Sequence, residues 1–139
     1  MPRIERSAKV TWEGNLARGV GLISADTGAF NELPFSLPTR IGASEGKTSP
    51  EELLAAAHAG CFAMGLANAL TSAGTPPAHM EVDCLIVMDE VEGQGHQIVA
   101  SHVTVKGDAT DETIAEADAD CPFSILLKNA GVEVTITRS

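Results

Sequence analysis

The spacing of apolar and polar positions changes along the chain, and each change marks a predicted element. Six segments are predicted to be strands, because apolar and polar residues alternate in them or because turn residues such as Gly28 and Gly93 bound them. These segments lie at residues 8–12, 17–24, 29–33, 82–90, 97–106 and 132–136. Between the third and fourth, the pattern becomes almost continuously apolar, which indicates a different kind of element.

That apolar stretch predicts a helix over residues 50–72. Ser49 suits the N-cap, Pro50 suits the first helical position, and Glu52 completes a Ser-x-x-Glu capping box. Gly74 lies just beyond the predicted end. The helix is apolar on nearly every side, so we expect it to be buried. By helical spacing, one face would consist of Leu54, Ala57, Cys61, Met64 and Asn68.

Three prolines limit the secondary structure of the remaining segments. Pro34 and Pro38 are expected to prevent regular pairing, which predicts a long irregular loop over residues 35–47. A helix over 111–120 should break at Cys121, because the residue before a proline is driven out of the helical region, and resume over 122–128. The order of elements predicts an α+β fold, with a mostly antiparallel sheet and a long buried central helix.

Composition narrows the classes of function. The 139 residues fit a single domain (1–139), and 44% of them are apolar. A net charge of −10 argues against nucleic-acid binding and against an anionic membrane surface. We also expect no membrane span, because no uninterrupted apolar run reaches roughly 18 residues. The start of the chain lacks an apolar signal core, which favours a reducing cytoplasm. There, an odd count of three cysteines suggests redox or catalytic thiols, not structural disulfides.

Cys61 and Cys121 are the candidate reactive thiols. Only a thiolate attacks a peroxide, and Cys61 lies too far into its helix for the helix dipole to lower its pKa. A cation must do so, and Arg40 is a candidate whose guanidinium Glu51 would hold. Cys121 caps a helix N-terminus, a position that also favours thiolate. The residues alone therefore leave open which cysteine attacks and which one condenses with the resulting sulfenic acid.

Other groups have simpler interpretations. Cys84 lies in a predicted strand, and we expect it to be inert. His58, one helical turn before Cys61, is expected to be a hydrogen-bonded interfacial side chain, although a Cys–His pair is conceivable. A zinc site lacks the usual ligand spacing, so no metal is expected. The acidic residues of 111–120 are expected to form a solvated helix face.

The cysteine motifs resemble those of the OsmC/Ohr family of organic hydroperoxide reductases. The resemblance rests on residues 48–62, on Cys121-Pro122-Phe123-Ser124, and on shorter matches at 12–14 and 38–40. It implies an OsmC-like intertwined homodimer without a resident cofactor, recycled by an external, lipoyl-type dithiol. It also implies the roles of four residues. Cys61 would attack the peroxide, Cys121 would resolve the sulfenic acid, and Arg40 and Glu51 would activate Cys61.

The resemblance implies reduction of organic hydroperoxides in oxidative-stress defence. Arg18 is the alternative to Arg40, because the Ohr branch carries its arginine nearer the N-terminus. Candidate walls of an apolar substrate pocket are Ile41, Phe62, Phe123 and Leu127. A second hypothesis is an OsmC-like binding or redox-sensing module, which has the same fold but no efficient peroxidase turnover.

Overall fold

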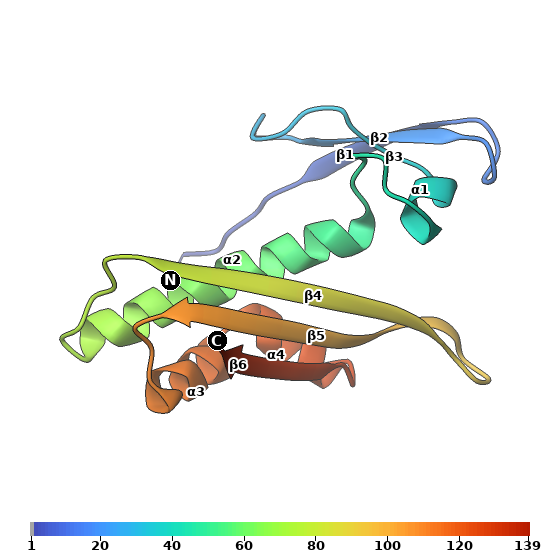
Figure 1. Cartoon of the computed structure of the whole chain (residues 1–139). Coiled ribbons are helices and arrows are strands. Elements are labelled where there is room, and N and C mark those ends of the chain that lie inside the picture. The colour runs from blue at the N-terminus through green and yellow to red at the C-terminus, as the bar shows by residue number, and fades with distance from the viewer. Residues whose placement is uncertain (1) are drawn as a thin grey trace. The chain divides into compact units, whose positions relative to one another are not determined.

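The computed structural model describes residues 2–139, and their contacts divide the chain into two compact units (Figure 1). The first ends at Pro50, and the second spans Glu51–Ser139. Each unit combines a three-stranded sheet with helix, which agrees with the predicted α+β class.

The first unit is a small antiparallel sheet followed by one helical turn. Its strands are β1 (Ala8–Glu13), β2 (Val20–Ala25) and β3 (Leu33–Phe35), in the order β1-β2-β3. Helix α1 (Leu37–Ile41) follows β3 directly. All three predicted strands are present, with the second and third starting three or four residues later than expected.

The expectation of an irregular loop over residues 35–47 was wrong for its first part. Pro34 lies on the edge strand β3, where its missing N–H costs no hydrogen bond of a central strand. Pro38 lies in the first turn of α1, where a proline fits, and the Ser36 side chain caps that turn by accepting from the Thr39 N–H. The prolines mark the positions of these two elements.

Gly21 allows two aromatic rings to meet over the centre of this sheet. It pairs with Trp12 on β1 and with Phe35 on β3, whose rings lie 5.7 Å apart between centroids. A Cβ atom at Gly21 would lie 2.2 Å from Phe35 Cε1, closer than any real contact. The sheet therefore requires glycine here for space.

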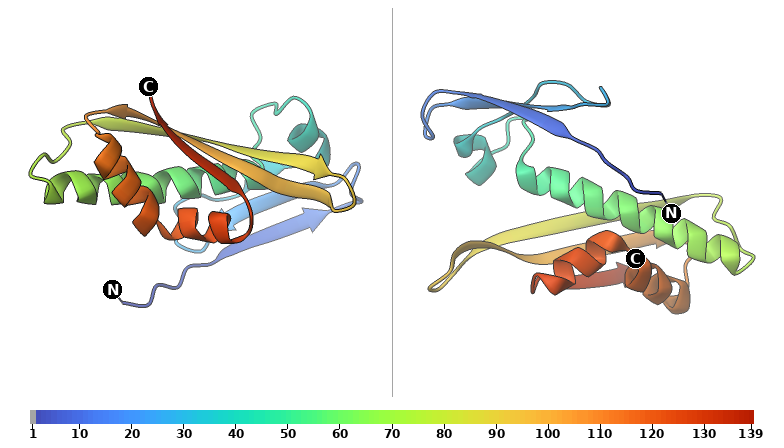
Figure 2. Two further views of the ribbon diagram at one scale, coloured as in Figure 1. Left: turned by 90° about the horizontal axis from the view of Figure 1, so that it is seen from below. Right: turned by 180° about the vertical axis from the view of Figure 1, so that it is seen from behind.

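The second unit is a sheet with helices on one of its faces (Figure 1; Figure 2). Strands β4 (Met80–Val91) and β5 (Gly95–Gly107) form the predicted hairpin. Strand β6 (Glu133–Arg138) pairs with β5 in parallel, giving the order β4-β5-β6. The helices that cover the sheet are α2 (Pro50–Ser72), α3 (Asp111–Asp120) and α4 (Pro122–Asn129).

Helix α2 begins and ends where the sequence predicts, but it is fully buried along one face and not on every side. Met64, on the predicted face, is 78% exposed, whereas Phe62 and Leu66 are fully buried. The buried side chains of the helix are those of His58, Phe62, Leu66, Ala69 and Leu70. Since apolar residues occur on every side of α2, spacing within the helix could not select this face.

The core of the second unit forms where α2 meets β5 and α3. Phe62 and Leu66 of α2 pack with Val103 of β5 and with Ala117 of α3. By length and composition α2 could also cross a bilayer, which corrects the expectation that no segment is apolar enough. A core helix of a globular protein can meet the same criterion. The buried face of α2 is part of the core of the second unit.

Candidate dithiol site

The break between α3 and α4 holds Cys121 at the start of α4. Cys121 is the N-cap of α4, with extended backbone angles (φ −74°, ψ 115°), and Pro122 occupies the first helical position. The Cys121 side chain makes no capping hydrogen bond to the helix. The first N–H groups of α4 are therefore available to other partners.

Cys61 of α2 lies at this helix start. Its thiol lies against the Cys121 thiol and the backbone of Phe123, the second residue of α4, and both neighbours act on the pKa of Cys61. Cys61 and Cys121 both pack against the core of the unit, and both are reduced. The fold thus brings together two cysteines that are sixty positions apart in the sequence, at the N-terminus of a helix.

Competing effects act on the acidity of Cys61. Burial raises the pKa of the thiol, and the hydrogen bond with Cys121 raises the pKa further. The backbone hydrogen bond at Phe123 lowers the pKa, because an N–H donor favours the thiolate. Within the second unit, burial dominates and the pKa of Cys61 is raised.

The two thiols differ in exposure. Cys121 is only 3% exposed, whereas Cys61 is partly exposed. Solvent therefore reaches residue Cys61 more readily than residue Cys121.

A buried polar cluster lies one helical turn from Cys61. His58 Nδ1 is 2.6 Å from Ser101 Oγ on β5, and His58 Nε2 is 2.8 Å from Ser124 Oγ on α4. All three side chains are completely buried. Cys84 Sγ on β4 lies 3.2 Å from the same Ser101 hydroxyl. We call these four side chains the His58 cluster. His58 is thus hydrogen-bonded as expected, but within the core of its own unit.

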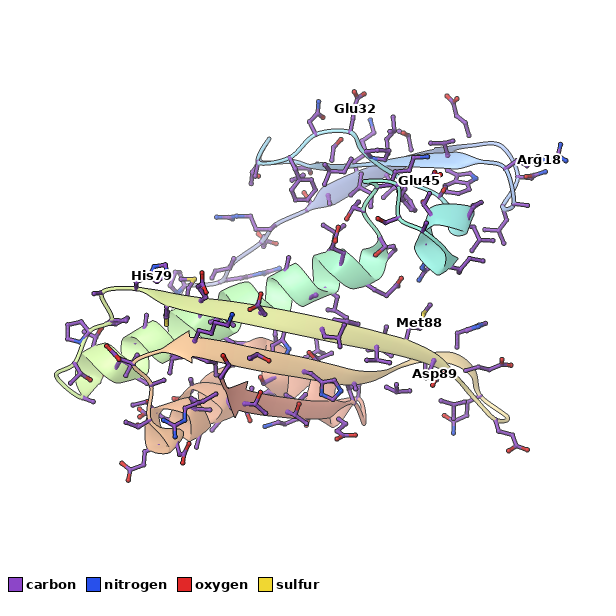
Figure 3. The ribbon with its side chains drawn as sticks, in the orientation of Figure 1. Arg18, Glu32, Glu45, His79, Met88 and Asp89 are labelled. Atoms are coloured by element: carbon purple, nitrogen blue, oxygen red, sulfur yellow. The ribbon has the colours of Figure 1, made fainter. Side chains whose placement is uncertain are left out.

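The two candidate arginines belong to the first unit. Arg18 lies in the turn between β1 and β2 (Figure 3). Arg40 lies in the last turn of α1 and lines a cavity of about 60 Å³ with mostly apolar walls. The other residues that line it are Trp12, Leu16, Phe35, Ser36 and Leu37. The pairing of either arginine with Cys61, and of Glu51 with Arg40, stays a prediction.

The four proposed pocket walls lie in different environments. Phe62 has no exposed surface and Leu127 is 5% exposed, so both are core residues in the structure. Phe123 is half-buried and packs against the core beside Cys61. Ile41, in the first unit, is 73% exposed. Of the four, Phe123 has the position most suited to meeting a substrate at Cys61.

Sequence reasoning missed two features of the site. It predicted that Cys121 caps the N-terminus of α4, which is confirmed, but it did not predict that the backbone of Phe123 contacts Cys61. It also did not connect His58 with Ser101 and Ser124, which are 43 and 66 positions away. Pro122 was the available signal for the first feature, since it marks a helix start whose free N–H groups need partners. The second had no sequence signal.

The chain belongs to the family described as OsmC-like protein, whose model matches residues 42–137. It is 37% identical over 140 residues to "Peroxiredoxin OsmC" of Escherichia coli (strain K12), a match that covers 96% of this chain and 94% of that protein. A protein of the same name from Shigella flexneri matches equally well.

Solved structures of the same family share the fold. The organic hydroperoxide resistance protein OhrB of Bacillus subtilis superposes with a TM-score of 0.74 at 26% identity, covering 96% of this chain and 98% of that one. An organic hydroperoxide resistance protein OsmC from Legionella pneumophila gives a TM-score of 0.77 at 18% identity, covering 99% of both chains. The second likeness concerns the fold alone.

Proposed function

We propose that this protein is a thiol-dependent peroxidase that reduces organic hydroperoxides to alcohols in oxidative-stress defence. The observation that carries the proposal is the contact between the Cys61 and Cys121 thiols in a chain of the OsmC-like family. The names of the relatives, a peroxiredoxin and an organic hydroperoxide resistance protein, support the same class of activity.

In the proposed reaction, Cys61 attacks and Cys121 resolves. The Cys61 thiolate takes the outer oxygen of the peroxide, the O–O bond breaks, and the alkoxide leaves as an alcohol after gaining a proton. The Cys121 thiol then attacks the Cys61 sulfenic acid, which forms a disulfide and releases water. The greater exposure of Cys61 and its contact with the backbone of Phe123 support this order.

Arg40 and Glu51 complete the proposed site. Because burial raises the pKa of Cys61, the thiol needs a nearby cation to become a thiolate at neutral pH. Arg40 would supply that charge, and Glu51 would orient its guanidinium. The apolar ring of Phe123, which packs beside Cys61, supports a preference for peroxides with an organic group.

The assembly, the reductant and the location of the protein belong to the same proposal. We propose a homodimer, because large apolar side chains such as Met64 and Leu126 are well exposed in the single chain. The disulfide would be reduced by an external, lipoyl-type dithiol in the cytoplasm. Light scattering tests the assembly, and a monomer at micromolar concentration contradicts it.

The test of the reaction is intact-mass analysis after one equivalent of cumene hydroperoxide, followed by peptide mapping. We expect loss of one pair of hydrogen atoms, mapped to Cys61 and Cys121. In Cys121→Ser, a sulfenic acid should be trapped on Cys61, and Cys84→Ser is the matched control. Hydrogen peroxide should react more slowly than cumene hydroperoxide. Thiols that stay reduced over minutes contradict the proposal.

One observation favours the alternative, a redox-sensing or binding module. The raised pKa of Cys61 is suited to a slowly reacting thiol. The two functions differ in steady-state turnover with excess dithiol. Reversible disulfide formation without sustained consumption of peroxide identifies the module, and sustained consumption identifies the enzyme.

A further inference from the structure

The His58 cluster joins the element that carries Cys61 to the element that carries Cys121. His58 lies on α2 three residues before Cys61, and Ser124 lies on α4 three residues after Cys121. The hydrogen bond of 2.8 Å between His58 Nε2 and Ser124 Oγ therefore connects the two cysteine-bearing helices directly beside the thiol contact. The other imidazole nitrogen is bonded to Ser101 on the sheet.

Geometry makes this connection specific. Ser124 is the third residue of α4 and directly follows Phe123, whose backbone contacts Cys61. Both ring nitrogens of His58 are within 2.8 Å of a hydroxyl, so the ring orientation is set at both ends. If the bond between His58 Nε2 and Ser124 Oγ were lost, two buried polar groups would be left unpaired, which disfavours movement of α4 away from α2.

We propose that His58 is a positioning residue for the dithiol, and that it sets the rate at which Cys121 closes on the oxidised Cys61. His58 does not contact the reacting sulfur atoms in this role. It acts through Ser124, by holding the first turn of α4 so that the Cys121 sulfur and the Phe123 backbone both face Cys61. The inference rests on the proposed function, because closure is its second step.

Closure needs this help because a disulfide has narrow geometric limits. The sulfur atoms must approach to about 2.05 Å, with a Cβ–S–S–Cβ dihedral near ±90°. A misplacement of the reacting groups by about 1 Å can slow such a step on the order of 100-fold. A neutral histidine suits the position, since burial lowers the pKa of His58 and a neutral ring can donate from one nitrogen and accept at the other.

Two matched serine variants separate positioning from general stability. Ser124→Ala and Ser101→Ala each remove one buried hydroxyl bonded to His58, but only Ser124 lies on α4. We expect Ser124→Ala to slow closure roughly tenfold or more, and Ser101→Ala to leave the closure rate within about threefold of the unmodified protein. A merely structural role of the cluster predicts equal effects.

Two variants of His58 provide the same comparison, because each retains a hydrogen bond to only one of the two serines. The amide of Gln reaches the position of Nε2, and the amide of Asn reaches that of Nδ1. His58→Gln should therefore retain the bond to Ser124 and close nearly as fast as the unmodified protein. His58→Asn should retain only the bond to Ser101 and close as slowly as Ser124→Ala.

The measurement is closure followed by rapid alkylation and intact mass, in parallel with cumene hydroperoxide and with diamide, an azo oxidant. Diamide adds to one thiol and is displaced by the other, so closure is measured without peroxide chemistry. If the unmodified protein closes with diamide but not with the hydroperoxide, the proposed function fails and the diamide series still decides the role of His58. Equal closure rates in Ser124→Ala and Ser101→Ala with both oxidants overturn the inference, as does a protein that diamide cannot close.

Discussion

The two units of the chain bury very different amounts of apolar side chain. Among residues 2–50, Ile23 is the one buried apolar residue, whereas the second unit has a continuous core that includes Phe62, Leu66 and Val103. The first unit also exposes several large apolar side chains. They include Val10, Leu16, Val20 and Ile41. Such a small sheet is marginal by itself and gains stability when another surface covers it.

This difference suggests a division of work within the proposed enzyme. The thiols, which need a fixed geometry to form a disulfide, lie in the unit with its own core. Both candidate activating cations, Arg40 and Arg18, lie in the unit without one. In the proposed function, the second unit would form the disulfide, and a cation of the first unit would lower the pKa of Cys61.

The largest expected effect concerns the contribution of the first unit to the chemistry. Arg40→Ala should slow oxidation of Cys61 by cumene hydroperoxide on the order of 100-fold at neutral pH, because without a nearby cation the thiol pKa is higher and less thiolate is present. The pH at which the reaction reaches half its maximum should rise. Arg18→Ala is the matched control. A large effect of Arg18→Ala and none of Arg40→Ala would assign the cation to Arg18.

The next prediction compares a buried apolar residue of each unit. Leu66→Ala should destabilise the protein by about 3–5 kcal/mol, and Ile23→Ala by about 2 kcal/mol, because a site with few buried neighbours relaxes more easily around a cavity. Urea unfolding should be followed by two probes. The fluorescence of Trp12, the single tryptophan, reports on the first unit, and far-UV circular dichroism reports mainly on the helices. Equal shifts of both transitions in both variants would contradict the difference between the units.

Substitution of one glycine by alanine in each unit should change the stability in opposite directions. Gly21→Ala should destabilise by about 1–3 kcal/mol, since its Cβ would overlap the Phe35 ring. Gly60→Ala, in the interior of α2, should stabilise by about 0.5–1 kcal/mol, because nothing lies within 4 Å of the added atom and alanine favours helix. Thermal unfolding measures both changes. If Gly60→Ala destabilises and light scattering shows dissociation, that face of α2 is an interface.

The smallest effect is a pH dependence of stability from His58. Burial lowers its pKa in the folded state, whereas the unfolded chain keeps a value near 6.5. Between these values the unfolded state binds the extra proton, so stability falls as the pH falls below about 6.5, by at most about 1.4 kcal/mol per pH unit. The decline ends below the folded-state pKa. The surrounding groups act in opposite directions, with Asp118 of α3 raising the pKa and Lys128 of α4 lowering it, while Cys84 of β4 faces Nδ1.

Urea unfolding at several pH values measures this slope. We expect His58→Gln to flatten it, because the variant has no group that titrates at this position. His79→Gln, in the exposed stretch before β4 (Figure 3), is the control. A slope that is unchanged in His58→Gln would assign the pH dependence to other groups.

Local sequence signals predicted most elements of the second unit well. Pro50 and the residues beside it marked the start of α2, and Pro122 marked the start of α4, because proline positions are set by the local backbone. Signals in the first unit were weaker. Its strands are short, with six, six and three residues, and the role of Pro34 depends on β3 being an edge strand, which is a property of the sheet.

The sequence by itself determined the class of fold, the two cysteine motifs and the family, because these depend on residue types and on spacing along the chain. Only the tertiary structure decided which face of α2 is buried, that β6 pairs in parallel with β5, and that the backbone of Phe123 contacts Cys61. It also placed His58 between Ser101 and Ser124. The physical reason is that each of these contacts joins residues far apart in the chain, and long-range packing selects among local arrangements that the sequence pattern permits equally.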